Sequence, residues 1–139
     1  AAWMRTRSGN NVVGKKWAMR GLMQILACNG MLAVLMDQNV TRKEGVFVDF
    51  FGIPACTNKG LALLSRKTGA AVLPIFILRD GRTHRIIIEH EVPLLITGDK
   101  EADTIENTRR FTKRIEDMIR KYPGQWFWVH RRWKTRLQA

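Results

Sequence analysis

Histidine and carboxylate side chains are the first candidates for chemistry in this sequence, because a histidine oriented by an acid can remove a proton. His84 is followed five positions later by Glu89, a spacing that would suit such a pair. Both residues, however, fall in a segment whose pattern predicts a β-strand, and an offset of five places side chains on opposite faces of a strand. We therefore expect no general base from this pair.

The other reactive side chains also lack partners at useful spacing. His90 and His130 have no suitable acid or nucleophile beside them in the sequence. Cys28 and Cys56 lack the Cys-x-x-Cys spacing of a zinc site. The sequence has no Gly-rich phosphate loop of Walker or Rossmann spacing and no Gly-x-Ser-x-Gly motif. The sequence alone thus predicts no catalytic residue, no metal site and no cofactor.

Asp37 and Gln38 are the strongest candidates for a polar ligand site. They follow the apolar run Leu32 to Met36, whose pattern predicts a strand buried on both faces. Ligands of open α/β sheets collect at the carboxyl ends of such strands. A second strand-like run, Val46 to Phe51, follows a polar turn. We therefore expect Asp37 and Gln38 to lie at the end of a strand, next to a ligand.

The rest of the chain alternates between helical and strand-like patterns. Strands are predicted over residues 70–78 and 83–92, on either side of an Asp-Gly turn. Helices are predicted over residues 13–29, from a Thr57 cap to Gly69, and from Asp99 to the Pro-Gly pair at 123–124. Strand, loop, strand, helix is the order of an α/β unit, and 139 residues fit one domain. The sequence predicts a single α/β domain.

The charge of the chain indicates an anionic partner. The chain has 24 Lys and Arg against 12 Asp and Glu, for a formal net charge of +12. Nucleic acid, an anionic membrane surface, and a phosphorylated or acidic substrate or carrier are all compatible with that charge. No apolar run approaches the roughly 18 residues that a membrane-spanning helix needs, and no signal-peptide pattern is present.

Three blocks of the sequence together resemble one family. DQNVTRKEGVFVDFFGIPACTNKGLALLSRKTGAAVLPIF is preceded by RTRSGN and followed by PGQWFWVHRRWKTR. In this order the blocks resemble the bacterial lipid A biosynthesis (lauroyl/myristoyl) acyltransferases, within the lysophospholipid acyltransferase superfamily. The resemblance implies a glycerolipid-acyltransferase-like α/β fold, a mixed sheet flanked by helices. It also implies that residues 1–139 are the C-terminal portion of one acyltransferase domain whose N-terminal part is missing.

The resemblance further implies an activity. Family members would transfer a fatty acyl chain from an acyl carrier protein or acyl-CoA to a hydroxyl of a phosphorylated glycolipid, at the cytoplasmic face of the inner membrane. The family's His-x4-Asp/Glu base would lie upstream of Ala1, so the 139-residue chain is expected to be inactive alone. Membrane attachment would be peripheral or through a missing N-terminal segment.

The matching positions carry expected roles. Arg7 would donate to a substrate phosphate, while Asp37 and Gln38 would shape the polar wall of the site. Two roles remain open for the other matches. Phe50 and Phe51 would line the acyl route or pack in the core; Arg131 and Arg132 would bind phosphate or hold the C-terminal segment against acids such as Asp37.

Other functions are compatible with parts of the sequence. An acyltransferase acting on a lysophospholipid or a phosphatidylinositol mannoside would keep the chemistry and change the acceptor. A basic nucleic-acid-binding or lipid-binding module without catalysis would use the Trp- and Arg-rich C-terminus. The resemblance favours lipid over nucleic acid, because an anionic membrane, a phosphorylated glycolipid and an acidic carrier would each bind a basic surface.

Overall fold

The computed structural model describes residues 6–7, 9–13 and 18–137. Its contacts divide the chain into two units, Ala1–Ala33 and Val34–Ala139. In the first unit, helix α2 spans Ala18–Ala27 and is followed by Asn29 with a left-handed φ of 55°. The predicted Asn-Gly stop of this helix is thereby confirmed. The helix was predicted to start at Val13, but Val13 lies in irregular chain; residues 14–17, between Val13 and α2, lie outside the described residues.

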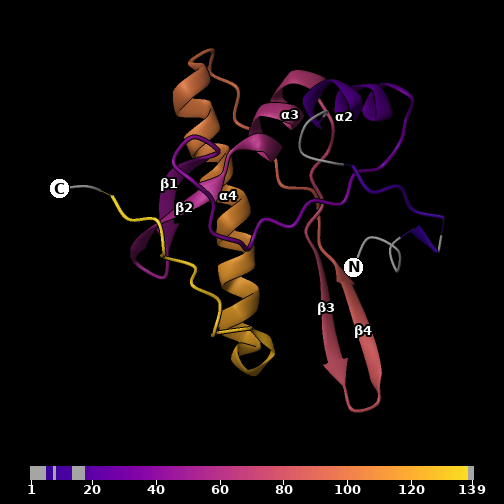
Figure 1. The fold of residues 1–139 in the computed structure, drawn as a ribbon, viewed down its shortest axis with the longest axis vertical. Coiled ribbons are helices and arrows are strands. Elements are labelled where there is room, and N and C mark those ends of the chain that lie inside the picture. The colour runs from indigo at the N-terminus through magenta and orange to yellow at the C-terminus, as the bar shows by residue number, and fades with distance from the viewer. Residues whose placement is uncertain (1–5, 8, 14–17, 138–139) are drawn as a thin grey trace. The chain divides into compact units, whose positions relative to one another are not determined.

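The second unit contains most of the described elements (Figure 1). Its fold confirms the predicted α/β class, and its strands, as far as the chain is described, form two separate antiparallel pairs, β1–β2 and β3–β4. Helix α4 contacts β1, β2 and α3. The elements are β1 (Gly45–Phe50), β2 (Ile53–Asn58), α3 (Gly60–Thr68), β3 (Ile75–Asp80), β4 (Thr83–Ile88), α4 (Lys100–Lys121) and the 3₁₀ helix η2 (Pro123–Gln125).

The predicted strand over Leu32–Met36 is wrong. Within the described residues this run pairs with no strand, and Leu35 is 66% exposed while Met36 is buried. A strand of this kind needs hydrogen-bonding neighbours for its backbone, and apolar side chains alone do not supply them. The nearest ladder contact is an isolated bridge between Asn39 and Thr57. Asp37 and Gln38 therefore lie in a bend that follows irregular chain.

The predicted Thr57 helix cap is also wrong. Thr57 lies inside β2 and is fully buried. Helix α3 begins three residues later, where the Asn58 side-chain oxygen accepts a hydrogen bond from the Gly60 N–H at 2.6 Å. The predicted end of the helix is confirmed, because Gly69 has a left-handed φ of 70°.

Helix α4 is the scaffold of the second unit. It begins where the sequence predicts, and the Asp99 side chain caps it by accepting from the N–H groups of Glu101 and Ala102. The second half of the helix buries an apolar stripe that includes Phe111, Met118 and Ile119. No helix among the described residues is both long and apolar enough to cross a bilayer.

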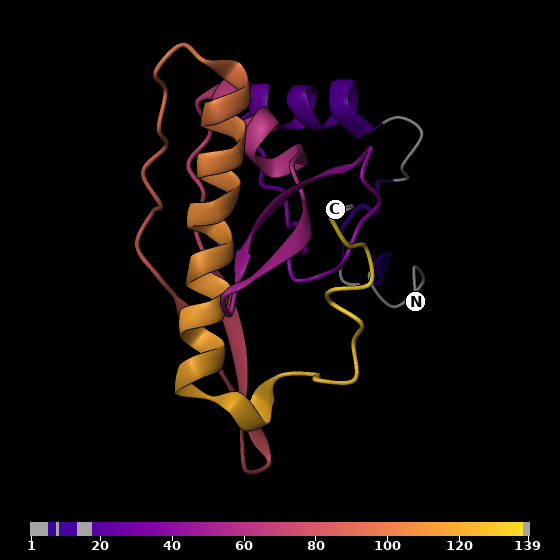
Figure 2. The ribbon, with the colours of Figure 1, turned by 90° about the vertical axis from the view of Figure 1, so that its left-hand side faces the viewer.

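The first half of α4 holds the preceding segment through buried polar groups. The Asn107 side chain accepts from the Leu95 N–H and donates to the Leu95 carbonyl, both at 2.8 Å. Segment 89–99 consequently runs along the helix, as Figure 2 shows. A buried polar side chain needs a hydrogen-bond partner, and the bonds that it forms fix the position of the segment that it binds.

Asp103 makes the same segment sensitive to acid. Its fully buried carboxylate accepts from the Thr97 hydroxyl at 2.7 Å and from the Thr97 N–H at 3.0 Å, and lies 3.4 Å from the Arg66 guanidinium. The hydroxyl bond from Thr97 is the largest cause that holds the pKa of Asp103 below its ordinary value of 3.8, while burial opposes it. The folded state therefore favours the ionised carboxylate.

This lowered pKa predicts a pH dependence of stability. Because the folded pKa lies below the unfolded one, Asp103 contributes stability at neutral pH that is lost as pH falls below 3.8 and through the folded pKa. We expect Asp103→Asn to be less stable than the native chain at pH 7, and this difference to shrink at pH 3. Urea unfolding at the two pH values measures it. A difference that stays constant would exclude an ionised Asp103 in the fold.

Candidate functional site

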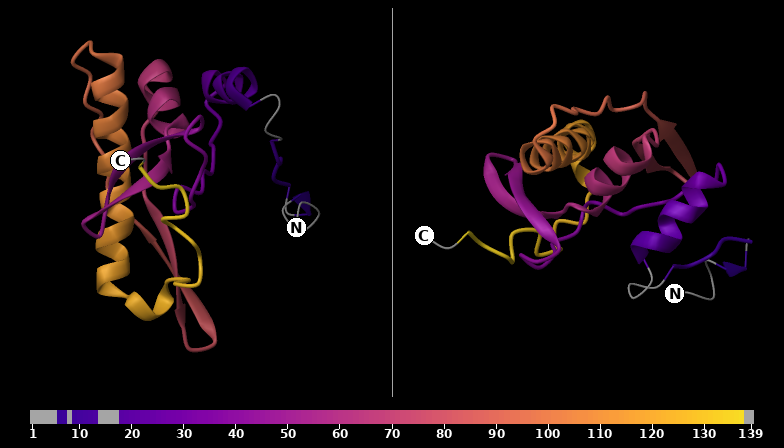
Figure 3. Two further views of the ribbon diagram at one scale, coloured as in Figure 1. Left: turned by 60° about the vertical axis from the view of Figure 1, so that its left-hand side comes forward. Right: turned by 90° about the horizontal axis from the view of Figure 1, so that it is seen from above.

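The C-terminal segment closes one side of the second unit. Residues 126–137 return from the end of α4 toward β1 and β2 (Figure 3). Thr135 and Asn39 hold this return, because the Thr135 N–H donates to Asn39 Oδ1 and the Asn39 amide donates to the Thr135 hydroxyl, both at 3.0 Å. The Thr135 hydroxyl also donates to the Val40 carbonyl at 2.9 Å. The segment around Asp37 and the C-terminal segment are thus held side by side, and we call this pair of segments the wall.

Arg132 is the buried centre of this wall. Its side chain is 1% exposed, and its two terminal guanidinium nitrogens donate, one to the Cys56 carbonyl at 3.0 Å and one to the Thr57 hydroxyl. The guanidinium lies over the Phe50 ring, 5.0 Å from its centroid. Burial lowers the pKa of Arg132, and the negative charge of Asp37 opposes that shift. Arg132 therefore joins the C-terminal segment to β2 and is electrostatically coupled to Asp37.

The two C-terminal arginines have different surroundings. Arg131 is exposed, whereas Arg132 is buried. Of the two roles that the sequence left open, the contacts of Arg132 support holding the C-terminal segment. Gln38 is exposed and Asp37 half-buried. A phosphate-binding role for this group remains a prediction, and Arg131 is the arginine whose side chain solvent can reach.

Phe50 and Phe51 lie at the turn between β1 and β2. Phe50 is 1% exposed and packs in a core cluster with Ala55 and Ile119. Phe51 and Gly52 both have positive φ, 58° and 79°, as a type I′ hairpin turn requires. Such a φ strains a phenylalanine, so other contacts must hold it in place.

Glu116 supplies one of those contacts. This side chain of α4 is 4% exposed and accepts from the Phe51 N–H at 2.8 Å. Arg120 donates to the same carboxylate at 2.9 Å and also lies over the Phe51 ring, 4.7 Å from its centroid. Burial raises the pKa of Glu116, but the hydrogen bonds from Phe51, Arg120 and Lys113 outweigh it, and the net shift is downward. An ionised Glu116 thus positions the Phe51 turn.

Five rings gather around this turn and form what we call the aromatic cluster. Its members are Phe50, Phe51, Trp126, Trp128 and Trp133. The Phe50 ring lies 4.8 Å from Phe51, 5.6 Å from Trp133 and 6.2 Å from Trp126, between centroids. The Trp-rich C-terminus therefore packs largely on the Phe-Phe-Gly turn. Of the two roles predicted for the phenylalanines, packing in the core holds for Phe50, while Phe51 is half-buried.

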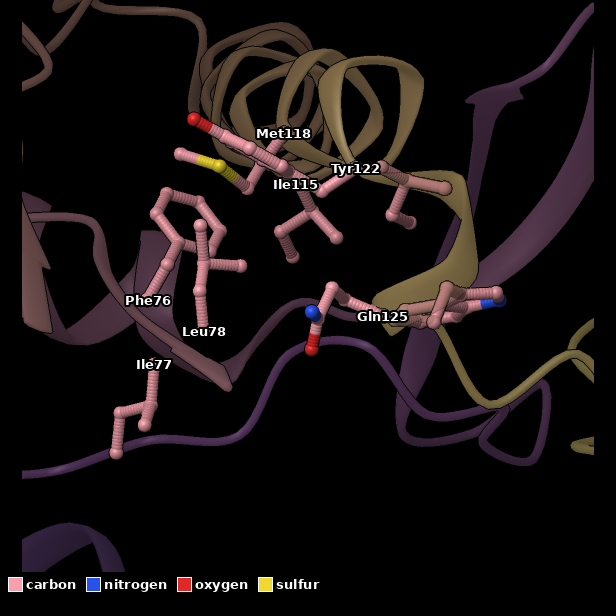
Figure 4. Close-up of a pocket in the computed structure, with 9 residues that line it drawn as sticks. Phe76, Ile77, Leu78, Ile115, Met118, Tyr122 and Gln125 are labelled. Carbon is pink, nitrogen blue, oxygen red and sulfur yellow. The ribbon is translucent and has the colours of Figure 1, made fainter. Parts of the chain in front are cut away.

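A pocket of about 160 Å³ lies between β3 and α4 (Figure 4). Phe76 and Leu78 of β3 face Ile115 and Met118 of α4 across it. Beyond them the lining is completed by Ile77, Ile119, Tyr122, Gln125 and Trp126. The lining is therefore predominantly apolar.

Among the described residues, no histidine forms an ion pair with a carboxylate. Glu89, the acid five positions after His84, forms an ion pair with Arg114 at 3.1 Å. Its carboxylate therefore already has a cationic partner. The His130 Nε2 atom accepts from the Asn39 N–H at 3.3 Å. In the part of the chain that the structure describes, no group of three His, Cys, Asp or Glu residues could hold a metal ion.

Many basic residues of α4 are engaged by acids. Arg109 and Arg110 both bind Glu106, at 2.7 and 2.9 Å. The hydrogen bond from Arg109 is the largest cause that lowers the pKa of Glu106 to about 2. Lys113 forms ion pairs with Glu116 and Asp117. This face of the helix is thus a network of paired charges rather than a purely cationic stripe.

Arg7 belongs to the first unit, where it is exposed and lies in a turn. It has interactions of its own within the structure. Its predicted contact with a substrate phosphate remains a prediction.

The sequence reasoning missed several residues that build this region. Glu116 was not singled out from the sequence, and Thr57 was predicted to be a helix cap. Gln125 was not singled out, yet its amide bonds with both the N–H and the carbonyl of Arg79, at 3.2 and 3.1 Å. The spacing of Glu116 to Lys113 and Arg120, three and four positions, was the available signal for an ion-pair centre.

Comparison with known proteins identifies the family. Residues 1–135 match the family described as bacterial lipid A biosynthesis acyltransferase. The Lipid A biosynthesis palmitoleoyltransferase of Escherichia coli K12 is 33% identical over 95% of this chain and 42% of its own length. The lauroyltransferase of the same strain is 30% identical over 99% of the chain and 44% of its own length, and the myristoyltransferase is 28% identical over 96% and 41%.

The chain therefore spans less than half the length of these curated relatives. The match nevertheless covers nearly all of the chain, and it includes the Asp37-Gln38 bend, the Phe-Phe-Gly turn and the C-terminal arginine pair described above. The chain belongs to the bacterial lipid A biosynthesis acyltransferase family.

Proposed function

We propose that this chain is the C-terminal portion of a single acyltransferase domain that acylates a lipid A precursor. The observation that carries the proposal is the family match over residues 1–135, together with relatives named for palmitoleoyl, lauroyl and myristoyl transfer. The apolar pocket and the aromatic cluster support it, because an acyltransferase must accommodate a hydrocarbon chain beside a polar acceptor.

In the proposed reaction, an acyl carrier protein or coenzyme A thioester donates the acyl group. The acceptor hydroxyl oxygen bonds to the thioester carbonyl carbon, the carbon–sulfur bond breaks, and the hydroxyl proton passes through a base to the released thiol. A positioned base of this kind contributes about 10² to 10⁴ in rate. We place that base, a histidine oriented by Asp or Glu, outside these 139 residues, since Glu89 pairs with Arg114 and His130 Nε2 is bonded by the Asn39 N–H.

The site residues of this chain would then bind and orient substrate. Arg7 and Arg131 would donate charge-assisted hydrogen bonds to phosphate groups of the glycolipid. Asp37 and Gln38 would form the polar wall, which Arg132 fixes from behind by its bonds to β2. Phe50 and Phe51 would separate this polar wall from the acyl chain.

The proposed partners and location follow from the same assignment. The basic surface would face an anionic membrane, at the cytoplasmic side of the inner membrane, and an acidic acyl carrier. Each Lys or Arg near an anionic leaflet contributes about 1 kcal/mol of attraction. The pairing of α4 cations with Glu106, Glu116 and Glu89 argues against a continuous phosphate-tracking stripe for nucleic acid.

An in vitro transfer assay tests the proposal. The protein that the gene encodes and the 139-residue chain alone would each be incubated with a lipid A precursor and a labelled acyl thioester. We expect labelled lipid from the encoded protein and none from the 139-residue chain. Transfer by the 139-residue chain would show that the base lies within it, and absence of transfer by the encoded protein with either thioester would overturn the activity.

A further inference from the structure

The β3–β4 hairpin has an apolar face on each side. Side chains alternate along β3, so that Phe76 and Leu78 line the pocket against α4 while Ile77 points away from it (Figure 4). Leu78 is buried, whereas Ile77 is 64% exposed. Among the described residues, the inner face of the hairpin is therefore packed and the outer face is open to solvent.

Four isoleucines form this outer surface, which we call the isoleucine face. The strand register pairs Ile75 with Ile88 and Ile77 with Ile86. Directly opposed residues of an antiparallel pair have Cβ atoms about 4.5–5.5 Å apart, so the four side chains form one block. Each of them is between 58% and 65% exposed. A contiguous exposed apolar patch of this kind marks a contact surface.

The composition of the hairpin indicates a sheet that lies between two layers. An antiparallel sheet with one solvated face alternates apolar and polar residues, whereas β3 begins with four consecutive apolar residues, Ile75–Leu78, and β4 ends with three, Ile86–Ile88. A two-stranded ribbon is marginally stable in water by itself. As far as the chain is described, β3 and β4 are the whole of their sheet. The hairpin therefore has the features of an inner element of a larger fold.

We propose that the isoleucine face is an internal surface of the whole domain and is covered by the part of the protein that precedes Ala1. This inference rests on the proposed function, in which residues 1–139 are the C-terminal portion of one domain. The length of the relatives supports this occupant. The match takes up 41–44% of the three relatives described above, so more than half of each lies outside it. A segment of that length is long enough to supply a further layer.

The chemistry of the face favours protein over a bilayer as the occupant. Surfaces that lie in a membrane interface are typically rich in Trp, Phe and Leu, and the isoleucine face has none of these. Branched isoleucine side chains on a strand instead pack well against a second layer of protein. Arg82, at the exposed turn of the hairpin, is nevertheless a cation beside this face, so an anionic bilayer is included in the test.

Cysteine labelling of the purified encoded protein tests whether the face is covered. Ile77→Cys places a thiol on the isoleucine face, and Arg82→Cys places one at the exposed turn. Peptide mass spectrometry gives the maleimide labelling rate at each position, with the buried native Cys56 as the slow reference. We expect labelling of Ile77→Cys to be at least about tenfold slower than labelling of Arg82→Cys, because a covered thiol reacts only when the layer opens. Similar rates for the two variants in the folded protein would overturn the proposal.

Photo-crosslinking identifies the occupant. The photoreactive amino acid p-benzoylphenylalanine replaces Ile77 in the encoded protein, and the same replacement of Arg82 is the control. We expect a cross-link from position 77 to a peptide that precedes Ala1, in a yield independent of protein concentration, and no such product from position 82. A product confined to residues 1–139, a cross-link between two copies, a cross-link to phosphatidylglycerol vesicles, or no cross-link from position 77 would each overturn the proposal.

Acyl transfer separates this inference from the proposed activity. Labelled lipid from the encoded protein, together with equal labelling of Ile77→Cys and Arg82→Cys, would overturn the covered face and leave the acyltransferase standing. Slow labelling of Ile77→Cys and a cross-link to the preceding chain, without any transfer by the native protein, would overturn the lipid A activity and leave the layer over the isoleucine face.

Discussion

Replacing Arg132 by alanine is expected to lower the free energy of unfolding by about 3 kcal/mol, because it removes a fully buried side chain together with the donor of two buried hydrogen bonds. The substitution leaves the Cys56 carbonyl and the Thr57 hydroxyl without their guanidinium donor. It also empties the space over the Phe50 ring. Urea unfolding, with the midpoint and slope fitted together, measures the change.

Arg131→Ala is the matched control for this prediction. Arg131 is the adjacent residue in the same segment and has the same side chain, but it is exposed. Its replacement should change stability by no more than about 0.5 kcal/mol. Arg132→Lys should fall between the two, because an ammonium keeps the charge and loses the planar fork. Equal destabilisation by Arg131→Ala and Arg132→Ala would show that Arg132 does not join the C-terminal segment to β2.

Replacing Glu116 by alanine is expected to lower the free energy of unfolding by about 2–3 kcal/mol. The carboxylate is the acceptor for the Phe51 N–H and for Arg120 and Lys113, and no other side chain replaces it at the Phe51 N–H among the described contacts. Since Phe51 holds a positive φ, the turn should open when this bond is lost. Unfolding monitored by tryptophan fluorescence would report both stability and the packing of Trp128 on Phe51.

Asp117→Asn is the control for Glu116. Asp117 follows it directly and also pairs with Lys113, at 2.9 Å, but its side chain is 41% exposed. An exposed ion pair contributes about 0–1 kcal/mol, so the control should lie near the native stability. A loss in Asp117→Asn as large as in Glu116→Ala would mean that the charge of the helix, and not the bond to Phe51, stabilises the turn.

Elements whose ends are determined by residues within the element itself were predictable from the sequence. The start of α4 at Asp99, the end of α3 at Gly69 and the turn at Gly81 each depend on one residue whose preferred geometry is local. The β3–β4 hairpin likewise has its turn residues at the predicted place. For these elements the neighbouring residues contain the information, so one sequence suffices.

Elements whose conformation depends on distant partners were not predictable in the same way. The run Leu32–Met36 has the composition of a buried strand but pairs with no described strand. Thr57 has the side chain of a helix cap, yet its hydroxyl lies in β2 and meets Arg132, 75 positions away. Propensity cannot anticipate such a contact, because the partner and not the local chain decides it.

The candidate site shows the same division. Asp37 was identified from the strand-like run before it and Arg132 from the resemblance, and the charge of Asp37 acts on the buried Arg132. The difference between a buried Arg132 and an exposed Arg131 depends on the path of the C-terminal segment, which Asn39 and Thr135 determine. The pocket beside Leu78 depends on the packing of a hairpin against a helix, and no sequence motif predicts that packing.

Lipid A analysis by mass spectrometry tests the central claim, that this chain is part of a lipid A acyltransferase, most directly. The encoded protein would be expressed in a bacterial strain whose own lipid A acyltransferases have been deleted, with its presence in the cell confirmed by immunoblot. We predict lipid A heavier by the mass of one acyl chain. Lipid A of unchanged mass, with the protein present and folded, would contradict the account.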